Sequence, residues 1–164
     1  MKKFALILIV LVVIAGTLAS CAQKKADLGP TLIKVTGKIG NTNSGTDYVL
    51  DEAAFTGKSV ELTYNDPWMG DGLKYKGILL KDLIDMVKPA SDAKTVSLVA
   101  TDGKAVDVSL DDAKKWDIML VHWGNGTVLD EKTGGPVKVA FSADARQTYA
   151  DEQWMWWLVE AKFK

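Results

Sequence analysis

The sequence predicts a domain of both strands and helices in which strands predominate, and three observations lead to this prediction. Asn125-Gly126 lies between two apolar runs and favours a tight hairpin turn, because such a turn needs positive φ at both positions. Asp102-Gly103 gives a second hairpin signal. Residues 78–87 instead carry leucine, isoleucine and valine at helical spacing, so they predict one amphipathic helix.

The segment 117–141 is predicted to form a unit of strands and tight turns, and the rest of the chain is expected to pack against it. A strand over residues 118–123 leads into the Asn-Gly turn. The glycine-proline turn at residues 134–136 then starts a new strand over residues 137–141, because proline fixes φ and cannot donate a hydrogen bond. Further strands are predicted over residues 32–35, 48–50, 59–64, 95–101 and 104–109, with helical turns over residues 51–55 and 110–116.

Side-chain chemistry predicts where the short helices begin and where loops lie. Asp51 is a predicted N-cap, and Ser109 with Asp112 forms a capping pair. Residues 66–72 contain a proline and two glycines and predict a loop, in which Trp68 is expected to cover the core. Residues 142–153 predict a long polar loop, and residues 153–159 predict a closing strand that is apolar on both faces.

Composition excludes several function classes. The chain has 164 residues and a formal net charge of −1, which does not indicate a nucleic-acid surface. It contains 19 lysines but a single arginine, so several arginine forks for phosphate recognition are unavailable. One cysteine and one histidine exclude a disulfide framework and a zinc site built from thiolates and imidazoles, and no metal site is predicted.

The first twenty residues predict a signal peptide. Lys2 and Lys3 precede an apolar run over residues 4–14, and small residues follow up to Ser20. An uncleaved membrane anchor is the alternative, but the apolar run is short for a span of about 20 residues. We therefore expect residues 1–20 to be removed from the mature chain.

Cys21 is the predicted lipidation site. Leu-Ala-Ser-Cys at residues 18–21 resembles the bacterial lipobox, in which the cysteine thiol is acylated and becomes the new N-terminus. Acyl chains such as palmitate hold a protein firmly to a membrane, because each buried methylene contributes about 0.8 kcal/mol. Residues 21–30 predict a tether and residues 31–164 the folded domain. The predicted location is extracytoplasmic, and by resemblance to lipoprotein sorting Ala22 suits an outer membrane, if the organism has one.

Trp68, His122, Arg146 and Tyr149 are candidates for ligand binding, and the first three have a structural alternative. Trp68 lies in a loop and either binds a ligand or covers the core. His122 is a site residue or a buried structural histidine. Arg146, the single arginine, lies in a polar loop with Tyr149, and its alternative role is a salt bridge to Asp144 or Asp151.

The order of these motifs resembles the molybdopterin-binding domain of the sulfite oxidase family of oxidoreductases. The resemblance rests on Tyr-Lys-Gly-Ile-Leu-Leu at residues 75–80, Asp-Gly at 102–103, Asn-Gly at 125–126, Gly-Gly-Pro at 134–136 and the tryptophan-rich terminal segment. It covers roughly residues 33–163. It implies an α+β fold with mixed and antiparallel sheets and short helices at the edges, and it implies molybdopterin as a cofactor.

The sequence departs from the family pattern at positions that matter for the cofactor. Catalytic members of the family ligate molybdenum through a cysteine, whereas this chain has no cysteine after Cys21. The family has an arginine shortly after the Gly-Gly-Pro turn, where this chain has Val137 and then Lys138, which makes Lys138 a further candidate for ligand binding. A molybdenum atom would lose its thiolate, and the pterin phosphate would lose most of its cationic clamp.

The sequence therefore leaves two functions open. The first is a lipid-anchored, non-catalytic binding or accessory module, whose partner is a protein or a small ligand. The second is a molybdopterin-dependent oxidoreductase or cofactor carrier without a cysteine metal ligand. A serine hydrolase is discounted because His122 is the only available base and no triad can be assembled around it.

Overall fold

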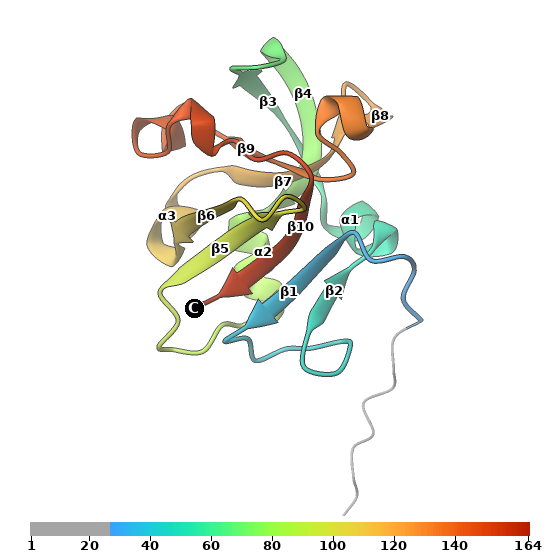
Figure 1. The fold of residues 1–164 in the computed structure, drawn as a ribbon, viewed down its shortest axis with the longest axis vertical. Coiled ribbons are helices and arrows are strands. Elements are labelled where there is room, and N and C mark those ends of the chain that lie inside the picture. Colours follow the sequence, from blue (N-terminus) through green and yellow to red (C-terminus); the bar gives the residue numbers. More distant parts are fainter. Residues whose placement is uncertain (1–26) are drawn as a thin grey trace, which may run out of the picture.

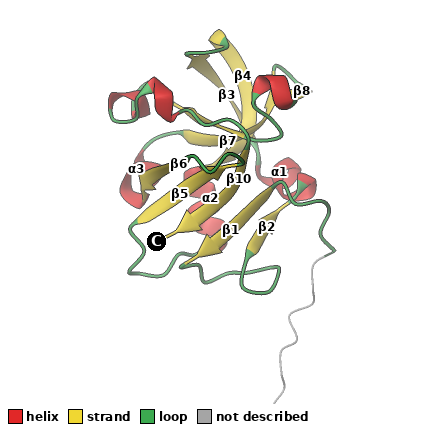
Figure 2. Cartoon of the chain, in the orientation of Figure 1, coloured by secondary structure: helices red, strands yellow, loops and turns green. Residues whose placement is uncertain are grey.

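The computed structural model describes residues 27–164, and in that part of the chain the strands form two five-stranded sheets flanked by short helices (Figures 1 and 2). This arrangement confirms the expected α+β fold with mixed and antiparallel sheets. The predicted signal peptide over residues 1–20, the predicted lipidation site Cys21 and the first half of the tether lie outside the described residues.

The first sheet is mixed because the earliest and latest strands of the described chain lie side by side and run parallel. β1 pairs with β10 in parallel, and the other neighbours in this sheet pair antiparallel. The strand order is β2-β1-β10-β5-β6, with the C-terminal strand at the centre (Figure 1). The bounds are β1 Ile33–Gly37, β2 Tyr48–Leu50, β5 Thr95–Ala100, β6 Ala105–Ser109 and β10 Leu158–Phe163.

The second sheet is antiparallel and is built around β7. This strand pairs with β4 over most of its length, with β9 near its start and with β8 at its end. The outer strand β3 pairs with β4, and this hairpin projects from the body of the molecule in Figure 1. The bounds are β3 Val60–Asp66, β4 Gly70–Leu79, β7 Ile118–Gly124, β8 Thr127–Val128 and β9 Lys138–Phe141.

The helices are short, and two begin at the predicted caps. The Asp51 carboxylate accepts a hydrogen bond from the backbone N–H of Ala54 at 2.9 Å, and the Ser109 hydroxyl accepts one from Asp112 at 3.0 Å. No helix within residues 27–164 is long and apolar enough to span a membrane. The bounds are α1 Glu52–Lys58, α2 Leu80–Val87, α3 Leu110–Lys115, η1 Glu131–Thr133, η2 Ala145–Gln147 and η3 Asp151–Gln153, the last three being 3₁₀ helices.

A single hydrophobic core contains residues of both sheets and of α2. The apolar face of α2 is buried and the helix contacts β4, β7 and α3. A Cβ atom at Gly77 in β4 would collide with the backbone carbonyl of Leu120 in β7, so this position requires glycine. The two strands can therefore approach closely only with glycine at this position.

Both predicted hairpins are confirmed. Asn125 has φ 48° and Gly126 has φ 79°, the positive values that a type I′ turn needs at both central positions. Asn125 also exchanges hydrogen bonds with Lys74 in β4, so this turn is attached to the neighbouring strand. The Asp102-Gly103 turn joins β5 to β6, which pair antiparallel as expected.

Three boundaries differ from the sequence prediction. The helix expected over residues 78–87 starts at Leu80, because Ile78 and Leu79 pair with β7 as the end of β4. The loop expected over residues 66–72 is shorter, since β3 extends to Asp66 and β4 begins at Gly70. The long loop over residues 142–153 contains η2 and η3.

The closing strand expected over residues 153–159 is confirmed as a central strand, but its predicted position is wrong. Residues 154–157 are irregular, and the strand β10 begins only at Leu158. Trp157 has φ 55°, a left-handed conformation that a strand cannot contain. The apolar side chains of this segment are therefore not all buried in a strand. Trp154 is buried, whereas Trp157 is 36% exposed.

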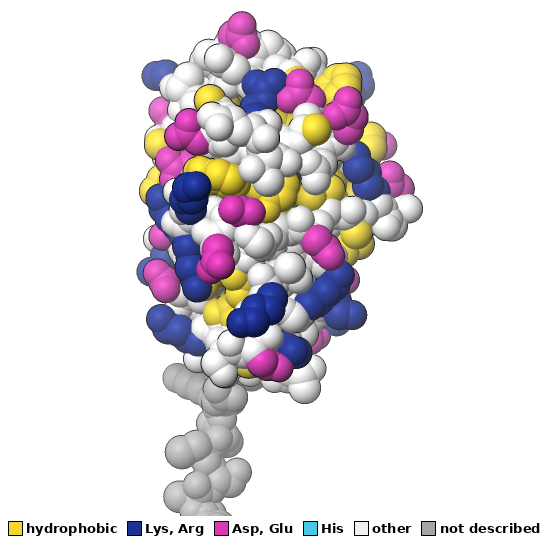
Figure 3. All heavy atoms as spheres, turned by 90° about the vertical axis from the view of Figure 1, so that its left-hand side faces the viewer, with side chains coloured by type: hydrophobic (Ala, Val, Ile, Leu, Met, Phe, Trp, Pro, Cys, Tyr) yellow, Lys and Arg dark blue, Asp and Glu magenta, His cyan; other side chains and the backbone are white. Residues whose placement is uncertain are grey.

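Trp68 does not cover the core as expected. Its side chain is 59% exposed, because it lies at the tip of the β3–β4 connection. On the face of the molecule drawn in Figure 3, hydrophobic side chains gather in a band across the middle, between regions richer in charged groups. Exposed apolar groups of this kind mark surfaces that bind other molecules.

Candidate binding site

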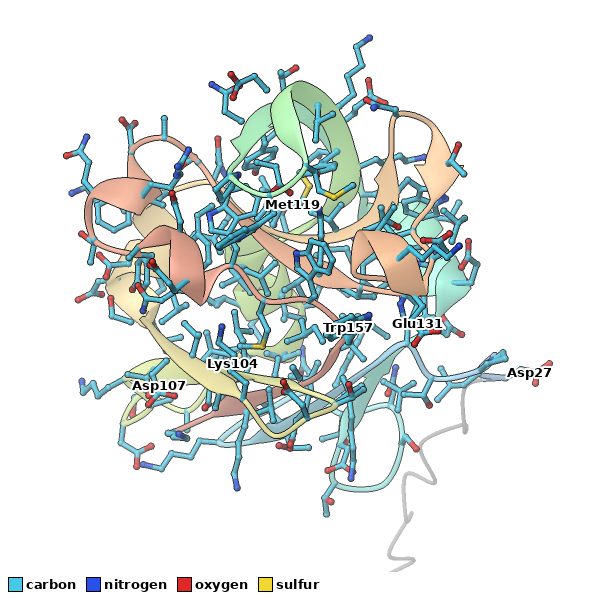
Figure 4. All side chains as sticks on the ribbon, turned by 45° about the horizontal axis from the view of Figure 1, so that its top comes forward. Asp27, Lys104, Asp107, Met119, Glu131 and Trp157 are labelled. Carbon is cyan, nitrogen blue, oxygen red and sulfur yellow. The ribbon has the colours of Figure 1, made fainter. Side chains whose placement is uncertain are left out.

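A pocket of about 380 Å³ opens where three separate segments meet. The β3–β4 connection contributes one tryptophan, the segment between η3 and β10 contributes three, and the β5–β6 turn contributes two charged groups, with one more from η3. We call it the tryptophan pocket. Its defining residues are Trp68, Trp154, Trp156, Trp157, Asp102, Lys104 and Glu152. Lys104 and Trp157 are labelled in Figure 4.

Trp157 is held in its left-handed conformation by three hydrogen bonds. Its backbone N–H donates to the carbonyl of Gly134 at 2.8 Å, and its carbonyl accepts from Thr101 at 3.0 Å. Its indole Nε1–H donates to the carbonyl of Glu131 at 2.9 Å. A non-glycine residue in this conformation costs about 1–3 kcal/mol and persists only where its surroundings impose it. The position of the Trp157 ring is therefore imposed by the fold.

Trp156 is held by close packing against the Gly-Gly-Pro turn. A Cβ atom added to Gly134 would lie 2.7 Å from Cγ of Trp156, so the indole occupies the space that a side chain there would need. The rings of Trp156 and Trp157 lie 5.8 Å apart with an interplanar angle of 82°. Two nearly perpendicular aromatic walls thus form one corner of the tryptophan pocket.

Beneath this corner lies a fully buried group of three polar side chains, the buried triad of Lys138, Asp66 and Tyr75. The Lys138 ammonium donates to the Asp66 carboxylate and to the Tyr75 hydroxyl, each at 2.7 Å. The Tyr75 hydroxyl donates to the same carboxylate oxygen at 2.7 Å. The side chains of Lys138 and Asp66 are both 0% exposed. These contacts explain how a charged lysine is accommodated in the core.

The buried triad also supports two walls of the tryptophan pocket. The second carboxylate oxygen of Asp66 accepts hydrogen bonds from the backbone N–H groups of Trp68 at 2.8 Å and Met69 at 3.0 Å. The Lys138 ammonium lies 5.7 Å from the ring centroid of Trp156. One ion pair therefore positions the loop that carries Trp68 and underlies the ring of Trp156.

Burial and pairing shift the pKa values of the triad. Desolvation favours the neutral form of Asp66, but hydrogen bonds from Lys138, Tyr75 and the backbone outweigh it and lower the pKa of this carboxyl. Desolvation lowers the pKa of Lys138, and Asp66 offsets part of that effect. Desolvation and the bond to Asp66 raise the pKa of Tyr75. Asp66 is thus the anion that neutralises Lys138.

Three other predicted site residues lie outside the tryptophan pocket. The ring of His122 is buried, with Nδ1 2.6 Å from the Pro136 carbonyl and Nε2 2.7 Å from the Glu52 carboxylate. Arg146 donates through Nε and Nη2 to Asp151, at 2.9 and 2.6 Å, which is one of the two salt bridges given above as its alternative role.

Tyr149 is also part of the packed interior. Its hydroxyl donates to the Asp112 carboxylate at 2.8 Å, and its ring stacks on Phe141 with centroids 5.1 Å apart. Its side chain is 5% exposed. Tyr149 therefore links the loop after β9 to α3 and does not face the tryptophan pocket.

The structure brings together only part of the predicted site. Trp68 lines the pocket and Lys138 underlies it, whereas His122 and Tyr149 are buried elsewhere and Arg146, with a side chain 30% exposed, lines a separate hollow. Sequence reasoning missed the carboxylates of Asp102 and Glu152 and the rings of the segment 154–157. The signal that could have located the pocket is the presence of three tryptophans in residues 154–157, because a short buried strand does not require so many large aromatic rings.

The profile of the oxidoreductase molybdopterin binding domain matches residues 51–148 of the chain. The chain belongs to this family. The match covers the whole buried triad but ends before Trp154, Trp156 and Trp157. Three of the four rings in the tryptophan pocket thus lie beyond the matched region. No curated protein sequence matches the chain.

A solved structure supports the same fold. The chain is similar to the sulfane dehydrogenase SoxCD from Paracoccus pantotrophus, with a TM-score of 0.63 and 14% sequence identity. The similarity covers 81% of this chain but only 38% of the SoxCD chain. At this identity the likeness concerns the fold alone, which agrees with the family match.

The residues of this chain do not fit a metal-bearing molybdopterin. Its single cysteine, Cys21, lies upstream of both the described domain and the family match, so that match contains no thiol for molybdenum. Residues 27–164 contain no cluster of three or more histidine, cysteine or carboxylate ligands. Two cations that were candidates for ligand binding are already paired, Lys138 with Asp66 and Arg146 with Asp151.

Proposed function

We propose that this chain is a lipid-anchored, extracytoplasmic member of its family that binds a ligand and does not catalyse a redox reaction. The observation that carries the proposal is the buried ion pair of Lys138 and Asp66. Lys138 is the cation that follows the Gly-Gly-Pro turn, and its ammonium is satisfied within the fold. It is therefore unavailable to an anionic cofactor unless the core opens.

The absence of a thiol in the matched region supports the non-catalytic part of the proposal. By the resemblance described above, catalytic members bind molybdenum through a cysteine, and a thiolate is a soft ligand that the matched region of this chain does not contain. The only thiol of this sequence is that of Cys21, which the proposal assigns to lipidation. The fold is thus retained while the metal ligand is not.

The binding part of the proposal rests on the tryptophan pocket. A pocket of about 380 Å³ with several aromatic walls and a few polar groups has the size and lining of a small-molecule site. Its walls are held by backbone hydrogen bonds and by the buried triad, so the site is formed before a ligand arrives. A preformed site reduces the entropy lost on binding.

The second candidate function is a molybdopterin-dependent oxidoreductase or cofactor carrier. The family match over residues 51–148 favours it. In that case the cofactor would be held by backbone amides and lysines, and the chain would supply no thiolate. We rank it below the binding module because Lys138, the cation that follows the Gly-Gly-Pro turn, is already paired with Asp66.

Two experiments test the proposal. Cys21→Ser is expected to release the protein from the membrane fraction or to leave its signal peptide uncleaved, whereas a variant that processes and fractionates like wild type would refute the lipid anchor. The purified protein is expected to show no electron transfer that depends on sulfite or a sulfoxide. Turnover above that of a buffer blank would favour the oxidoreductase reading instead.

A further inference from the structure

We propose that the tryptophan pocket binds a small alkylated ammonium ion, such as a trimethylammonium compound. The inference rests on the proposed binding function and names the chemical class of its ligand. Four features carry it, namely the aromatic walls, the charges at the rim, the rigidity of the walls and the size of the pocket.

Indole rings dominate the lining of the pocket, as aromatic rings do in sites that bind ammonium ions. The rings of Trp156 and Trp157 stand at 82° with centroids 5.8 Å apart, and Trp68 adds a third ring that is 59% exposed. The negative face of an indole ring attracts a cation, and tryptophan is the best aromatic side chain for this interaction. Alkyl groups on the nitrogen would also gain apolar contact with the same rings.

The charges at the rim select a cation over an anion. Two carboxylates, Asp102 and Glu152, line the pocket beside one ammonium, Lys104. That ammonium donates to the backbone carbonyl of Glu152 at 2.5 Å, which keeps it at the edge. A second hollow shares Trp157 and Asp102 with the pocket and has the acidic residue Glu131 in its lining. An anionic phosphate would meet an excess of negative charge here.

The buried cation beneath the pocket does not oppose this selection. Lys138 lies 5.7 Å from the centroid of Trp156, but its charge is neutralised by Asp66 at 2.7 Å. The ion pair therefore holds the ring in place without adding net positive charge below it. The negative groups at the rim remain the dominant local charges.

The walls are rigid and the space is small. Trp157 is held by three hydrogen bonds and Trp156 by packing on Gly134, so neither ring has to be ordered when a ligand binds. A volume of about 380 Å³ lies at the low end of ligand pockets, which favours a compact ion over an extended chain.

The test compares choline with its uncharged isostere, in which a tert-butyl group replaces the trimethylammonium group. The full chain is purified in dodecyl maltoside, which carries no ammonium group, and binding is followed by tryptophan fluorescence and calorimetry. We expect choline to bind and the isostere to bind about tenfold more weakly, because only the cation interacts with the ring faces and the carboxylates.

Variants locate the site. Trp68→Leu removes an exposed wall, and Asp102→Asn removes a rim charge while keeping an oxygen that can accept the hydrogen bond from Lys104 N–H. Each is expected to weaken choline binding by about fivefold to tenfold. Trp116→Leu is the matched control, because Trp116 lies at the end of α3 and does not line the pocket. Its choline affinity should equal that of wild type.

Equal binding of choline and its isostere, or no binding of choline, would overturn the inference. So would an equal loss in Trp116→Leu and Trp68→Leu. These outcomes differ from failure of the proposed function, which would appear as molybdenum or sulfite-dependent turnover in the same preparation. Protein free of molybdenum that does not bind choline would refute the ammonium ligand alone.

Discussion

The ammonium of Lys138 lies 2.7 Å from the carboxylate of Asp66, and neither side chain reaches solvent. The two residues are 72 positions apart in the sequence, so this contact ties the end of β3 to the start of β9. The same carboxylate holds the loop of Trp68, and the same ammonium underlies Trp156. The pair therefore serves both the stability of the second sheet and the shape of the tryptophan pocket.

Removing one member of this pair is expected to be costly. Lys138→Met should lower the free energy of unfolding by about 3–5 kcal/mol, because it leaves the Asp66 charge buried and unpaired. The double variant Lys138→Met/Asp66→Asn should be more stable than Lys138→Met alone, since the buried charge is gone. Denaturant unfolding measures both.

A surface ion pair provides the control for that experiment. Lys81 lies 2.7 Å from Asp117, but both side chains are more than 40% exposed, at 42% and 44%. Lys81→Met should therefore change the free energy of unfolding by less than about 1 kcal/mol. A similar loss for Lys81→Met and Lys138→Met would show that burial does not distinguish the two pairs.

Two buried tyrosines predict a loss of stability in alkali. Desolvation raises the pKa of Tyr64 and of Tyr75 well above the ordinary value of 10.0, and the charges of Asp117 and Asp66 add to this. Above pH 10.0 each tyrosine is deprotonated in the unfolded chain but protonated in the folded one. The stabilisation present below that pH is then lost at about 1.4 kcal/mol per pH unit for each group.

The variant Tyr75→Phe tests this linkage. It removes one of the two titrating groups, so the free energy of unfolding should fall less steeply with pH above 10.0 than in wild type. Urea unfolding at pH values on both sides of 10.0 gives the two slopes. Identical slopes would mean that Tyr75 ionises equally in both states.

A side chain introduced at Gly126 in the Asn125-Gly126 turn should lower the free energy of unfolding through backbone conformation alone. No atom lies within 4 Å of the position where Gly126 would carry a Cβ, but its φ is +79°. Gly126→Val should therefore destabilise by about 1–3 kcal/mol through backbone strain alone. Lys132→Ala in η1 should stay within about 0.5 kcal/mol of wild type. Equal shifts in thermal midpoint for the two variants would contradict the turn assignment.

The left-handed conformation of Trp157 predicts an unusual order of stability. Glycine is normally less stable than alanine, but at φ 55° alanine retains the strain and glycine does not. Trp157→Gly should therefore be more stable than Trp157→Ala by about 1 kcal/mol. Thermal unfolding of the two variants measures this difference. An alanine variant that matches or exceeds the glycine variant would show that the strain is absent.

The sequence predicted correctly those turns and helix caps that depend on only one or two neighbouring residues. The Asn125-Gly126 and Asp102-Gly103 turns and the caps at Asp51 and Ser109 lie where they were expected, because each depends on one or two residues. The start of α2 was misplaced by two residues for the opposite reason. Leu79 satisfies a helical pattern, but its pairing with Met119 in β7 places it in a strand.

The candidate site depends on contacts between distant segments and was therefore harder to predict. Trp68 was found as a candidate, but nothing in the sequence indicates that it lines the same pocket as Trp156. An apolar run such as residues 154–157 has the same composition whether it lies in a buried strand or lines a pocket. Lys138 was predicted as a candidate for ligand binding, and its pairing with Asp66 could not be foreseen because Asp66 lies on another strand.

The metal content of the purified protein tests the central claim most directly. The full chain is expressed in a host that makes molybdopterin, passed through gel filtration, and its molybdenum is measured by elemental analysis. The family-matched region has no thiol, and Lys138, the cation after the Gly-Gly-Pro turn, is paired with Asp66 in the buried triad. We therefore predict far less than one molybdenum atom per chain. A nearly stoichiometric amount of molybdenum that survives gel filtration would contradict the account and establish the chain as a cofactor-bearing member of its family.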